Sequence, residues 1–494
     1  MKRVYTLFIA LLSVVASFAQ ESDVEINGAW MKKHYSKTEY MIPMQDGVKL
    51  YTAVYTPKNK KIQSPILLCR TQNGCEPYGK KAVALWRRGA YKQYLQAEYI
   101  LVFQDVRGQG KSEGNFADAQ LPNDAYSTIN WLQRKVRRYN GNVGVWGSGE
   151  DGMYAIQAAM CGHPSIKAVS PQAILKAVDD IDTPMTAAML FVGGLFDGVS
   201  KSCVWESYKS VAQSNKNLDC RIVVGPWLNN AWCTDKGGTE LGEEYFSQDA
   251  TSEFYRQEIE FPFFDYYLRG GEDSGASSAG ALIYFTGENC WREISNLNKI
   301  KTEELSLYLS ENNYLTTRQS QEIGLSTSYV FNPDEPTPYH TDSSQPLKPE
   351  YIVAGQQFLE NRRDVLTFTA DAIEEDITAI GEVELFLYAS TQTDGIDFVV
   401  KIIDESANNE QEMMVRAEMF RNSPNNYEEC EGGVRKYKFR LSNIAHTFLA
   451  GHRIKLQIQS AWYPLYDVTQ KTPCEVYIHH DKEHVSAIKF HIIK

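Results

Sequence analysis

The sequence predicts an α/β domain built on a parallel sheet, followed by a domain made mainly of β-strands. Three observations support this fold class. Up to residue 269, short apolar runs alternate with helical patterns, as in successive strand–helix–strand units. After a segment rich in Gly and Ser, strand-like runs continue to the C-terminus and helical patterns are scarce. Aromatic residues, which favour sheets, make up 12% of the 494 residues.

The first domain is expected to begin with a hairpin over 40–57, whose turn contains Asp46-Gly47. Continuous apolar runs follow, which are typical of strands buried on both faces of a parallel sheet. They lie at 65–70, 99–104, 143–146, 166–169, 188–193 and 221–224. Helical patterns lie between them, at 80–97, 124–136 and 152–160. We therefore predict that this domain spans residues 35–275.

The second domain is predicted over residues 276–494. The segment 270–280 (GGEDSGASSAG) has the composition of a flexible linker and separates the two domains. Beyond it, turn residues separate short strand-like runs at 281–286, 305–310, 383–390, 397–403, 436–441 and 453–460. This pattern predicts an antiparallel sandwich or jelly roll.

The first twenty residues predict export. Met1-Lys2-Arg3 is basic, the run 4–15 is almost entirely apolar, and small residues lead up to Ala19. This is the pattern of a signal peptide over residues 1–19. The apolar run is too short for a membrane span, so we expect no membrane insertion and a periplasmic or secreted mature protein.

Charge and cysteine usage narrow the functional classes. The chain has 62 acidic and 50 basic residues, for a formal charge of −12, and a negative surface repels nucleic acid. Its nine cysteines are scattered and none forms C-x-x-C, which argues against a disulfide scaffold and a zinc or redox motif. One or two disulfide bridges remain compatible with the sequence.

The sequence contains no common cofactor or metal motif. No phosphate-binding loop, H-E-x-x-H or calcium loop occurs, so we expect neither cofactor nor metal.

Eight segments then occur together in a characteristic order. They are 104–114 (QDVRGQGKSEG), 126–131 (YSTINW), 140–144 (NGNVG), 193–197 (GGLFD), 224–227 (VGPW), 263–268 (FFDYYL), 361–366 (NRRDVL) and 451–454 (GHRI). From about residue 40 to the end, the chain resembles the X-Pro dipeptidyl-peptidase, cocaine esterase and α-amino-acid ester hydrolase family. The resemblance implies an α/β-hydrolase fold with a C-terminal jelly roll and a Ser-His-Asp triad.

The resemblance places the nucleophile in the turn 147–152 (GSGEDG). Laid on the family's G-x-S-Y-x-G pattern, the serine position holds Gly149. A frame shifted by one residue would use Ser148, but it puts Trp146 and Glu150 where the sharp turn needs small residues. Glycine suits the strained backbone of such a turn when no nucleophile is needed. We therefore predict that the nucleophile is missing.

The resemblance also locates the base, the acid and the oxyanion donor. The histidine of the family's GPW-x-H pattern is Asn229 here, and an amide does not shuttle protons near neutral pH. No histidine lies between residues 164 and 339 to replace it. Asp197 matches the triad aspartate, and we expect it to accept hydrogen bonds from Asn229 and loop amides. Asn73 stands in place of the oxyanion-hole tyrosine, as an altered donor of shorter reach.

Gly149 and Asp197 are only 48 positions apart. Active relatives carry a large helical cap in this interval, so the resemblance implies that the cap is largely deleted. Together these losses predict an exported member that has lost serine-hydrolase catalysis and acts in binding or assembly. The alternative is an active hydrolase of acyl esters, amides or X-Pro-type dipeptides with altered residues, such as Glu150 or Asp151 as a carboxylate nucleophile. Residual catalysis through Ser148 is a third hypothesis.

For the binding hypothesis, the ligand is expected to be a small molecule, a peptide or a sugar. The aromatic residues of 460–467 (SAWYPLYD) could line a ligand groove, although packing against the first domain is the simpler interpretation. The sequence leaves the ligand and the oligomeric state open.

Overall fold

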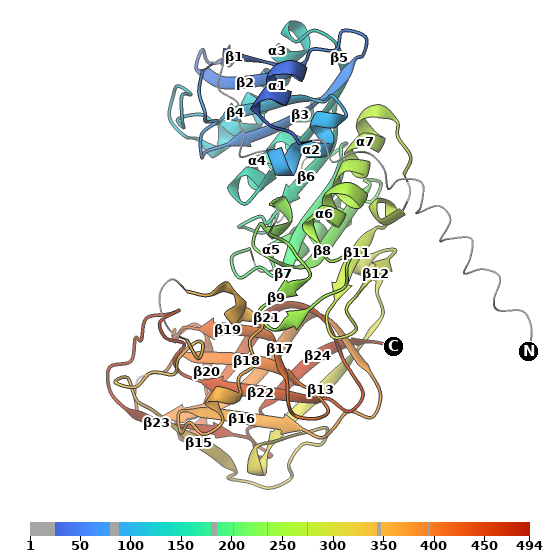
Figure 1. Ribbon diagram of the computed structural model, residues 1–494. Coiled ribbons are helices and arrows are strands. Elements are labelled where there is room, and N and C mark those ends of the chain that lie inside the picture. Colours follow the sequence, from blue (N-terminus) through green and yellow to red (C-terminus); the bar gives the residue numbers. More distant parts are fainter. Residues whose placement is uncertain are drawn as a thin grey trace, which may run out of the picture.

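The computed structural model describes residues 25–79, 88–178, 185–200, 202–234, 236–273, 275–342, 347–393 and 395–494. The chain forms two bodies stacked end to end, with the blue-to-yellow first domain above the orange-to-red second domain (Figure 1). The predicted signal peptide and the first half of the helix expected at 80–97 lie outside the described residues. Within them, no helix combines the length and the apolar character needed to span a bilayer.

The first domain is built on a ten-stranded sheet in the order β1-β2-β4-β3-β5-β6-β7-β8-β11-β12. All neighbours from β4 to β11 are parallel, whereas the hairpin β1–β2 joins β4 antiparallel and β12 joins β11 antiparallel. The strands are β1 (Tyr35–Pro43), β2 (Lys49–Pro57), β3 (Ser64–Thr71), β4 (Ile100–Asp105), β5 (Tyr139–Ser148), β6 (Ile166–Gln172), β7 (Ala188–Phe196), β8 (Cys220–Leu228), β11 (Ala281–Phe285) and β12 (Cys290–Ile294). The predicted hairpin and parallel strands are confirmed.

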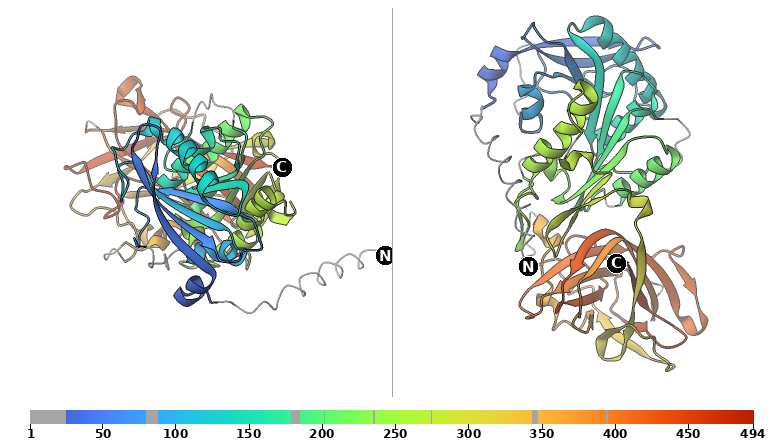
Figure 2. Two further views of the ribbon diagram at one scale, coloured as in Figure 1. Left: turned by 90° about the horizontal axis from the view of Figure 1, so that it is seen from above. Right: turned by 90° about the vertical axis from the view of Figure 1, so that its right-hand side faces the viewer.

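Helices cover both faces of this sheet (Figure 2). They are α1 (Gly28–His34), α2 (Arg88–Gln96), α3 (Leu121–Lys135), α4 (Glu150–Met160), α5 (Cys203–Ser214), α6 (Ser252–Phe254) and α7 (Phe261–Arg269), with a π-helical turn at Tyr255–Glu260. Every residue of β3 and β4 is buried, because each strand has a covered face on either side. In α3, Ala125, Ile129 and Leu132 recur at helical spacing and are buried in the core, as predicted.

The boundary predicted at residue 275 is displaced toward the C-terminus. β11 pairs with β8 and β12 with β11, so the first sheet runs on to Ile294, and the second begins at β13 (Thr302–Ser310). The described part of the segment taken for a linker includes a 3-10 helix at Gly275–Ser278. Gly270 ends α7 in the left-handed conformation, with φ 78°, and Asp273 pairs with Arg221 at 2.8 Å. Composition misled here because glycine also terminates helices.

The second domain is an all-β sandwich with strands that are almost all antiparallel, as predicted (Figure 1). Inward-facing apolar side chains of its two layers form one core, including Leu385, Phe398 and Ile458. Besides β13, the strands are β14 (Tyr314–Thr316), β15 (Ser326–Phe331), β16 (Val365–Ala370), β17 (Ile377–Thr391), β18 (Phe398–Glu405), β19 (Glu412–Phe420), β20 (Tyr427–Glu429), β21 (Arg435–Phe448), β22 (Arg453–Gln459), β23 (Cys474–His479) and β24 (Ala487–Ile493). Two short strands, β9 (Glu240–Leu241) and β10 (Glu244–Tyr245), pair by themselves.

Backbone hydrogen bonds join the two domains. The N–H of Thr286, just after β11, donates to the carbonyl of Ala445 in β21 at 3.1 Å, and the N–H of Thr447 donates to the carbonyl of Thr286 at 2.8 Å. The backbones approach so closely that a Cβ at Gly287 would lie 2.0 Å from the Thr447 carbonyl oxygen. Ala445 also belongs to the same buried apolar cluster as the core of the first domain. The two domains therefore share a bonded and packed junction.

The connection between β6 and β7 spans only residues 173–187. Its described parts, 173–178 and 185–187, contain no helix. A connection of this length cannot carry a large helical cap, since one ordinary helix already takes about eleven residues. The cap is therefore largely absent, as the interval between Gly149 and Asp197 predicted.

Candidate functional site

The four residues that the sequence singles out all follow parallel strands of the first sheet. Gly149 comes directly after β5, Asp197 after β7 and Asn229 after β8, while Asn73 lies two positions beyond β3. The carboxyl ends of parallel strands meet at one edge of the sheet, where α/β proteins hold their ligands. The fold thus gathers these residues at a single edge.

The turn between β5 and α4 is built on three glycines. Gly149 has φ 66° and ψ −126°, and its N–H donates to the carbonyl of Gln172 at 2.9 Å. A Cβ at Gly147 would lie 2.2 Å from the carbonyl oxygen of Asp151, and one at Gly152 would lie 2.6 Å from that of Gln172. A Cβ at Gly149 would meet no atom within 4 Å. Sterics therefore require glycine on either side of position 149, whereas position 149 itself faces open space.

Asp197 is a buried carboxylate with a full set of hydrogen bonds. Its Oδ1 accepts from the N–H groups of Val199 at 2.9 Å and Ser200 at 3.0 Å, and its Oδ2 accepts from the Ser200 hydroxyl. The side-chain amide of Asn229 donates to both carboxylate oxygens at 2.9 Å. The side chain is only 1% exposed, so these donors replace the water that a carboxylate would otherwise bind. Asp197 fixes the loops after β7 and β8.

A chain of polar contacts connects Asp197 to the glycine turn. The side-chain amide of Asn230 donates to Oδ1 of Asn229 at 2.8 Å, and the Ser148 hydroxyl donates to Oδ1 of Asn230. The sequence reasoning missed Asn230. Its backbone adopts the left-handed conformation, with φ 61° and ψ 9°, which asparagine tolerates better than most residues. The consecutive asparagines after the GPW segment were the available signal.

This chain of contacts has no group that can exchange a proton near neutral pH. The amides of Asn229 and Asn230 neither gain nor lose a proton there, in contrast to the imidazole of a histidine. The Ser148 hydroxyl therefore donates to an oxygen that cannot take its proton away. As arranged, the edge can position and hydrogen-bond a polar group, and the Ser148 hydroxyl has an amide oxygen as its acceptor in place of an imidazole.

Burial favours the protonated form of two other side chains near the turn. The Cys233 thiol lies 3.1 Å from Oε1 of Gln172, and burial raises its pKa, so it stays protonated. Glu260 is buried beside the amide of Gln172, which donates to it at 2.7 Å, and burial raises the pKa of this carboxyl group.

Asn73 is exposed, and its backbone N–H donates to the Thr71 hydroxyl at 3.0 Å. Within the described part of the chain, no hydrogen bond joins its side chain to the glycine turn. The neighbouring Gln72 instead accepts a hydrogen bond from the Tyr154 hydroxyl of α4 at 2.9 Å. The position of the altered oxyanion donor is therefore at the correct edge, but its side chain lies outside the polar contacts described above.

Two further candidates can be placed. Glu150 and Asp151 form the first turn of α4, where the helix dipole favours negative charge, and Glu150 is exposed. Trp462 of the aromatic stretch is 3% exposed and packs edge-on against Tyr351 and parallel to Tyr466. These neighbours belong to the second domain, so the expectation that the stretch packs against the first domain is wrong for Trp462.

Two family models match the chain. The model described as X-Pro dipeptidyl-peptidase (S15 family) matches residues 46–182, and that of the X-Pro dipeptidyl-peptidase C-terminal non-catalytic domain matches residues 261–488. The matches account for most of the chain and follow the order of its two domains. The chain belongs to the X-Pro dipeptidyl-peptidase and cocaine esterase family.

Individual relatives agree with this assignment. A cocaine esterase from Rhodococcus sp. (strain MB1 Bresler) is 24% identical over 583 aligned positions, which cover 92% of this chain and 98% of the esterase. Because the alignment is longer than the 494 residues of this chain, the esterase has segments without a counterpart here. A crystal structure of an aminopeptidase from the marine sediment archaeon Thaumarchaeota archaeon superposes with a TM-score of 0.83 at 25% identity, covering 97% of this chain and 100% of that one.

A structure of an α-amino-acid ester hydrolase superposes with a TM-score of 0.81 at 24% identity, covering 96% of this chain and 99% of that one. The X-Pro dipeptidyl-peptidase and cocaine esterase family combines an α/β-hydrolase domain with a C-terminal β domain, and this chain has both. Its membership makes it a relative of esterases and peptidases.

Proposed function

We propose that this family member is exported, has lost serine-hydrolase catalysis, and uses the polar edge after β5, β7 and β8 to bind a ligand. The observation that carries the proposal is the amide of Asn229, which donates to both oxygens of Asp197 at 2.9 Å. An acid–base pair needs an imidazole at this place to take a proton from the nucleophile. With an amide there and Gly149 at the turn, both the base and the nucleophile are absent from the proposed site.

The open space at Gly149 favours binding over a purely structural role. A Cβ there would meet no atom within 4 Å, so no other side chain has filled the place that a nucleophile would occupy. The short β6–β7 connection leaves this edge without a large cap. We therefore propose a small molecule, peptide or sugar that reaches the edge from solvent.

The alternative function is hydrolysis with altered residues. The carboxylates of Glu150 and Asp151 stand next to the turn and could act as nucleophiles, but hydrolysis of the resulting intermediate still needs an activated water. A screen of ester and amide substrates tests this alternative. Turnover that is lost in Glu150→Gln or Asp151→Asn would favour it over the binding hypothesis.

The experiment that tests the loss of serine catalysis is labelling with a fluorophosphonate. This reagent reacts with a serine whose hydroxyl is deprotonated by a base, and Ser148 donates its hydrogen bond to an amide oxygen instead. We expect no covalent adduct on the full chain after prolonged incubation, as measured by intact-mass spectrometry.

The double variant Gly149→Ser, Asn229→His is the matched positive control, because it restores a serine and an imidazole beside Asp197. Adduct formation on the double variant alone supports the proposal. An adduct that maps to Ser148 in the unmodified chain contradicts it and favours the third hypothesis, residual catalysis through this serine.

Export is tested by the N-terminus of the mature protein. We expect cleavage after Ala19, which leaves Gln20 as the first residue, because the small-residue pattern that signal peptidase recognises ends there. Intact-mass analysis of the protein recovered outside the cytoplasm checks the site. A mature chain that keeps Met1 and the apolar run 4–15 would exclude this part of the proposal.

A further inference from the structure

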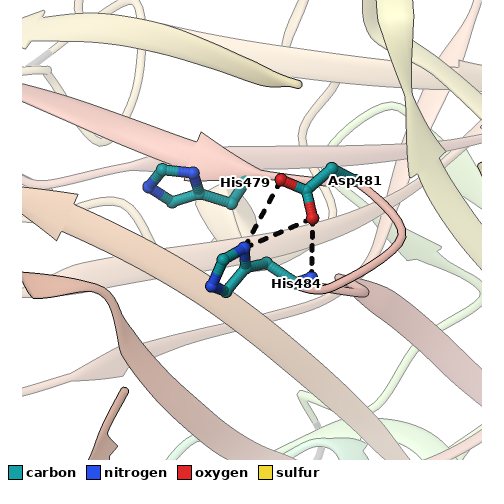
Figure 3. A group of neighbouring side chains, drawn as sticks. All are labelled: His479, Asp481 and His484. Carbon is teal, nitrogen blue, oxygen red and sulfur yellow. Dashed lines mark hydrogen bonds and ion pairs between the residues drawn. The ribbon is translucent and has the colours of Figure 1, made fainter. Parts of the chain in front are cut away.

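Three potential metal ligands meet on the second domain, away from the edge described above. His479 ends β23, and Asp481 and His484 lie in the turn that leads to β24 (Figure 3). Their ligand atoms all lie within 4.8 Å of one another. We propose that His479, Asp481 and His484 bind one Zn²⁺ ion, at a site independent of the function proposed for the first domain.

The distances between His484 and Asp481 are long for a hydrogen bond and also fit two ligands of one metal ion. Nδ1 of His484 lies 3.3 Å from Oδ1 and 3.4 Å from Oδ2 of Asp481. Hydrogen bonds between nitrogen and oxygen are usually roughly 2.7–3.2 Å long. Two ligand atoms on a tetrahedral zinc ion, each about 2.0–2.1 Å from the metal, are separated by roughly 3.3–3.4 Å. The His484–Asp481 spacing therefore corresponds to one edge of a zinc tetrahedron.

Surrounding groups hold the three side chains in place. Oδ1 of Asp481 accepts from the N–H groups of Glu483 and His484, both at 2.8 Å, and Oδ2 accepts from the N–H of Gly324 at 3.0 Å. The Ser390 hydroxyl lies 2.8 Å from Nε2 of His479, which leaves Nδ1 of this ring for a metal. Such outer hydrogen bonds orient ligands in metal sites and raise their affinity.

Charge also favours a cation here. The Asp481 side chain is 3% exposed, and among the described residues its one ion-pair partner is His484. A divalent ion between this carboxylate and the two imidazoles would complement its negative charge, which the three N–H donors do not neutralise. The His484 side chain is 21% exposed, so water can reach the fourth coordination position. Imidazole and carboxylate ligands with one open position are typical of Zn²⁺.

Zinc titration of the full chain tests the proposal. The protein is first stripped with a chelator, and zinc affinity is then measured by competition with a chromophoric chelator. We expect one ion per chain with micromolar or tighter affinity, and a loss of about 100-fold or more in both His479→Ala and His484→Ala, since even outer partners of metal ligands contribute roughly 10–100-fold. His491→Ala is the matched control, because His491 is exposed on the neighbouring β24 and lies outside the cluster.

Cobalt substitution separates this site from the thiols of the chain. The chain has nine cysteines, and Cys290 among them is exposed. A tetrahedral Co²⁺ spectrum without a thiolate charge-transfer band, lost in His479→Ala and kept in His491→Ala, supports the site. The proposal is overturned if a thiolate charge-transfer band appears, or if no zinc binds at 100-fold molar excess. It is also overturned if zinc affinity is unchanged in both cluster variants, or falls equally in His491→Ala. Far-UV circular dichroism of the metal-free variants identifies any that fail to fold. If one of the two cluster variants does not fold, the zinc affinity of the other tests the site.

Discussion

Replacing Asp197 by alanine is expected to destabilise the protein by about 3–5 kcal/mol, because several hydrogen-bond donors lose a shared acceptor and each buried donor left unsatisfied costs about 1–3 kcal/mol. The N–H and the hydroxyl of Ser200, a residue that is 1% exposed, both lose their acceptor, and so does the half-buried Asn229 amide. The N–H of Val199 belongs to an exposed residue and adds less. Equilibrium unfolding in urea measures the effect.

Asn229→Ala is the control for this prediction. It removes the amide that donates to both carboxylate oxygens, but Asp197 keeps its three other donors, so we expect a loss of only about 1 kcal/mol. A large effect of Asp197→Ala with a small effect of Asn229→Ala is the signature of a carboxylate that holds loops together. If Asp197→Ala unfolds at the same denaturant concentration as the parent, the structural role assigned to Asp197 is wrong.

The second large effect concerns repair of the triad. We expect Gly149→Ser with Asn229→His to produce measurable hydrolysis of activated aryl esters. The rate should be roughly 10²–10³-fold lower than in an enzyme with an intact oxyanion hole, because Asn73 stands at the position that the resemblance assigns to the oxyanion-hole tyrosine. The site has room for the new side chain, since a Cβ at position 149 meets no atom within 4 Å. The positive φ of 66° makes the serine strained, at a cost of about 1–3 kcal/mol.

The imidazole must also displace the present pairing of Asp197. A histidine at position 229 can donate to one carboxylate oxygen, while the N–H groups of Val199 and Ser200 remain bound and keep the carboxylate oriented. Without the cap, water is not excluded and remote binding energy is not available for catalysis. Amide substrates, whose hydrolysis depends most on water exclusion and remote binding energy, should hardly react.

The single variants Gly149→Ser and Asn229→His are the controls, measured side by side with the double variant against an aryl ester and a peptide amide. Nucleophile and base act as a unit, so each single variant should stay close to the parent. Peptide-amide turnover by the double variant at about 1 s⁻¹ or more, within the usual range for enzymes, would show that the cap and Asn73 are dispensable.

The parallel sheet of the first domain could be predicted from the sequence because each central strand is an uninterrupted apolar run. β3 and β4 are buried at every position, and such runs have few alternative structures. In the second domain, β15 (STSYVF) and β19 (EMMVRAEMF) escaped prediction. In β19 the charged Glu412 and Arg416 are buried, and in β15 the apolar Val330 is exposed, so neither strand shows the expected alternation of apolar and polar residues. β23 does alternate buried and half-buried residues, so a search for period two could have found it.

At the site, sequence reasoning predicted the hydrogen bond between Asn229 and Asp197, because the resemblance assigns these two positions to the base and the acid of one triad. It missed Asn230 and its contact with Ser148, which depend on a left-handed backbone conformation that no spacing rule reveals. It also missed His479, Asp481 and His484 as a group. Their spacing matches no common metal motif, and only the turn between β23 and β24 brings them together.

The junction at Thr286 has a consequence for motion. Many two-domain proteins admit ligands by hinge opening, which requires an interface that separates at small cost. Here a hinge would have to break the paired backbone bonds of Thr286 with Ala445 and Thr447 and split an apolar cluster to which both domains contribute. These contacts oppose hinge opening between the two domains. The ligand proposed for the turn at Gly149 would then enter past local loops, whose motions are faster than those of whole domains.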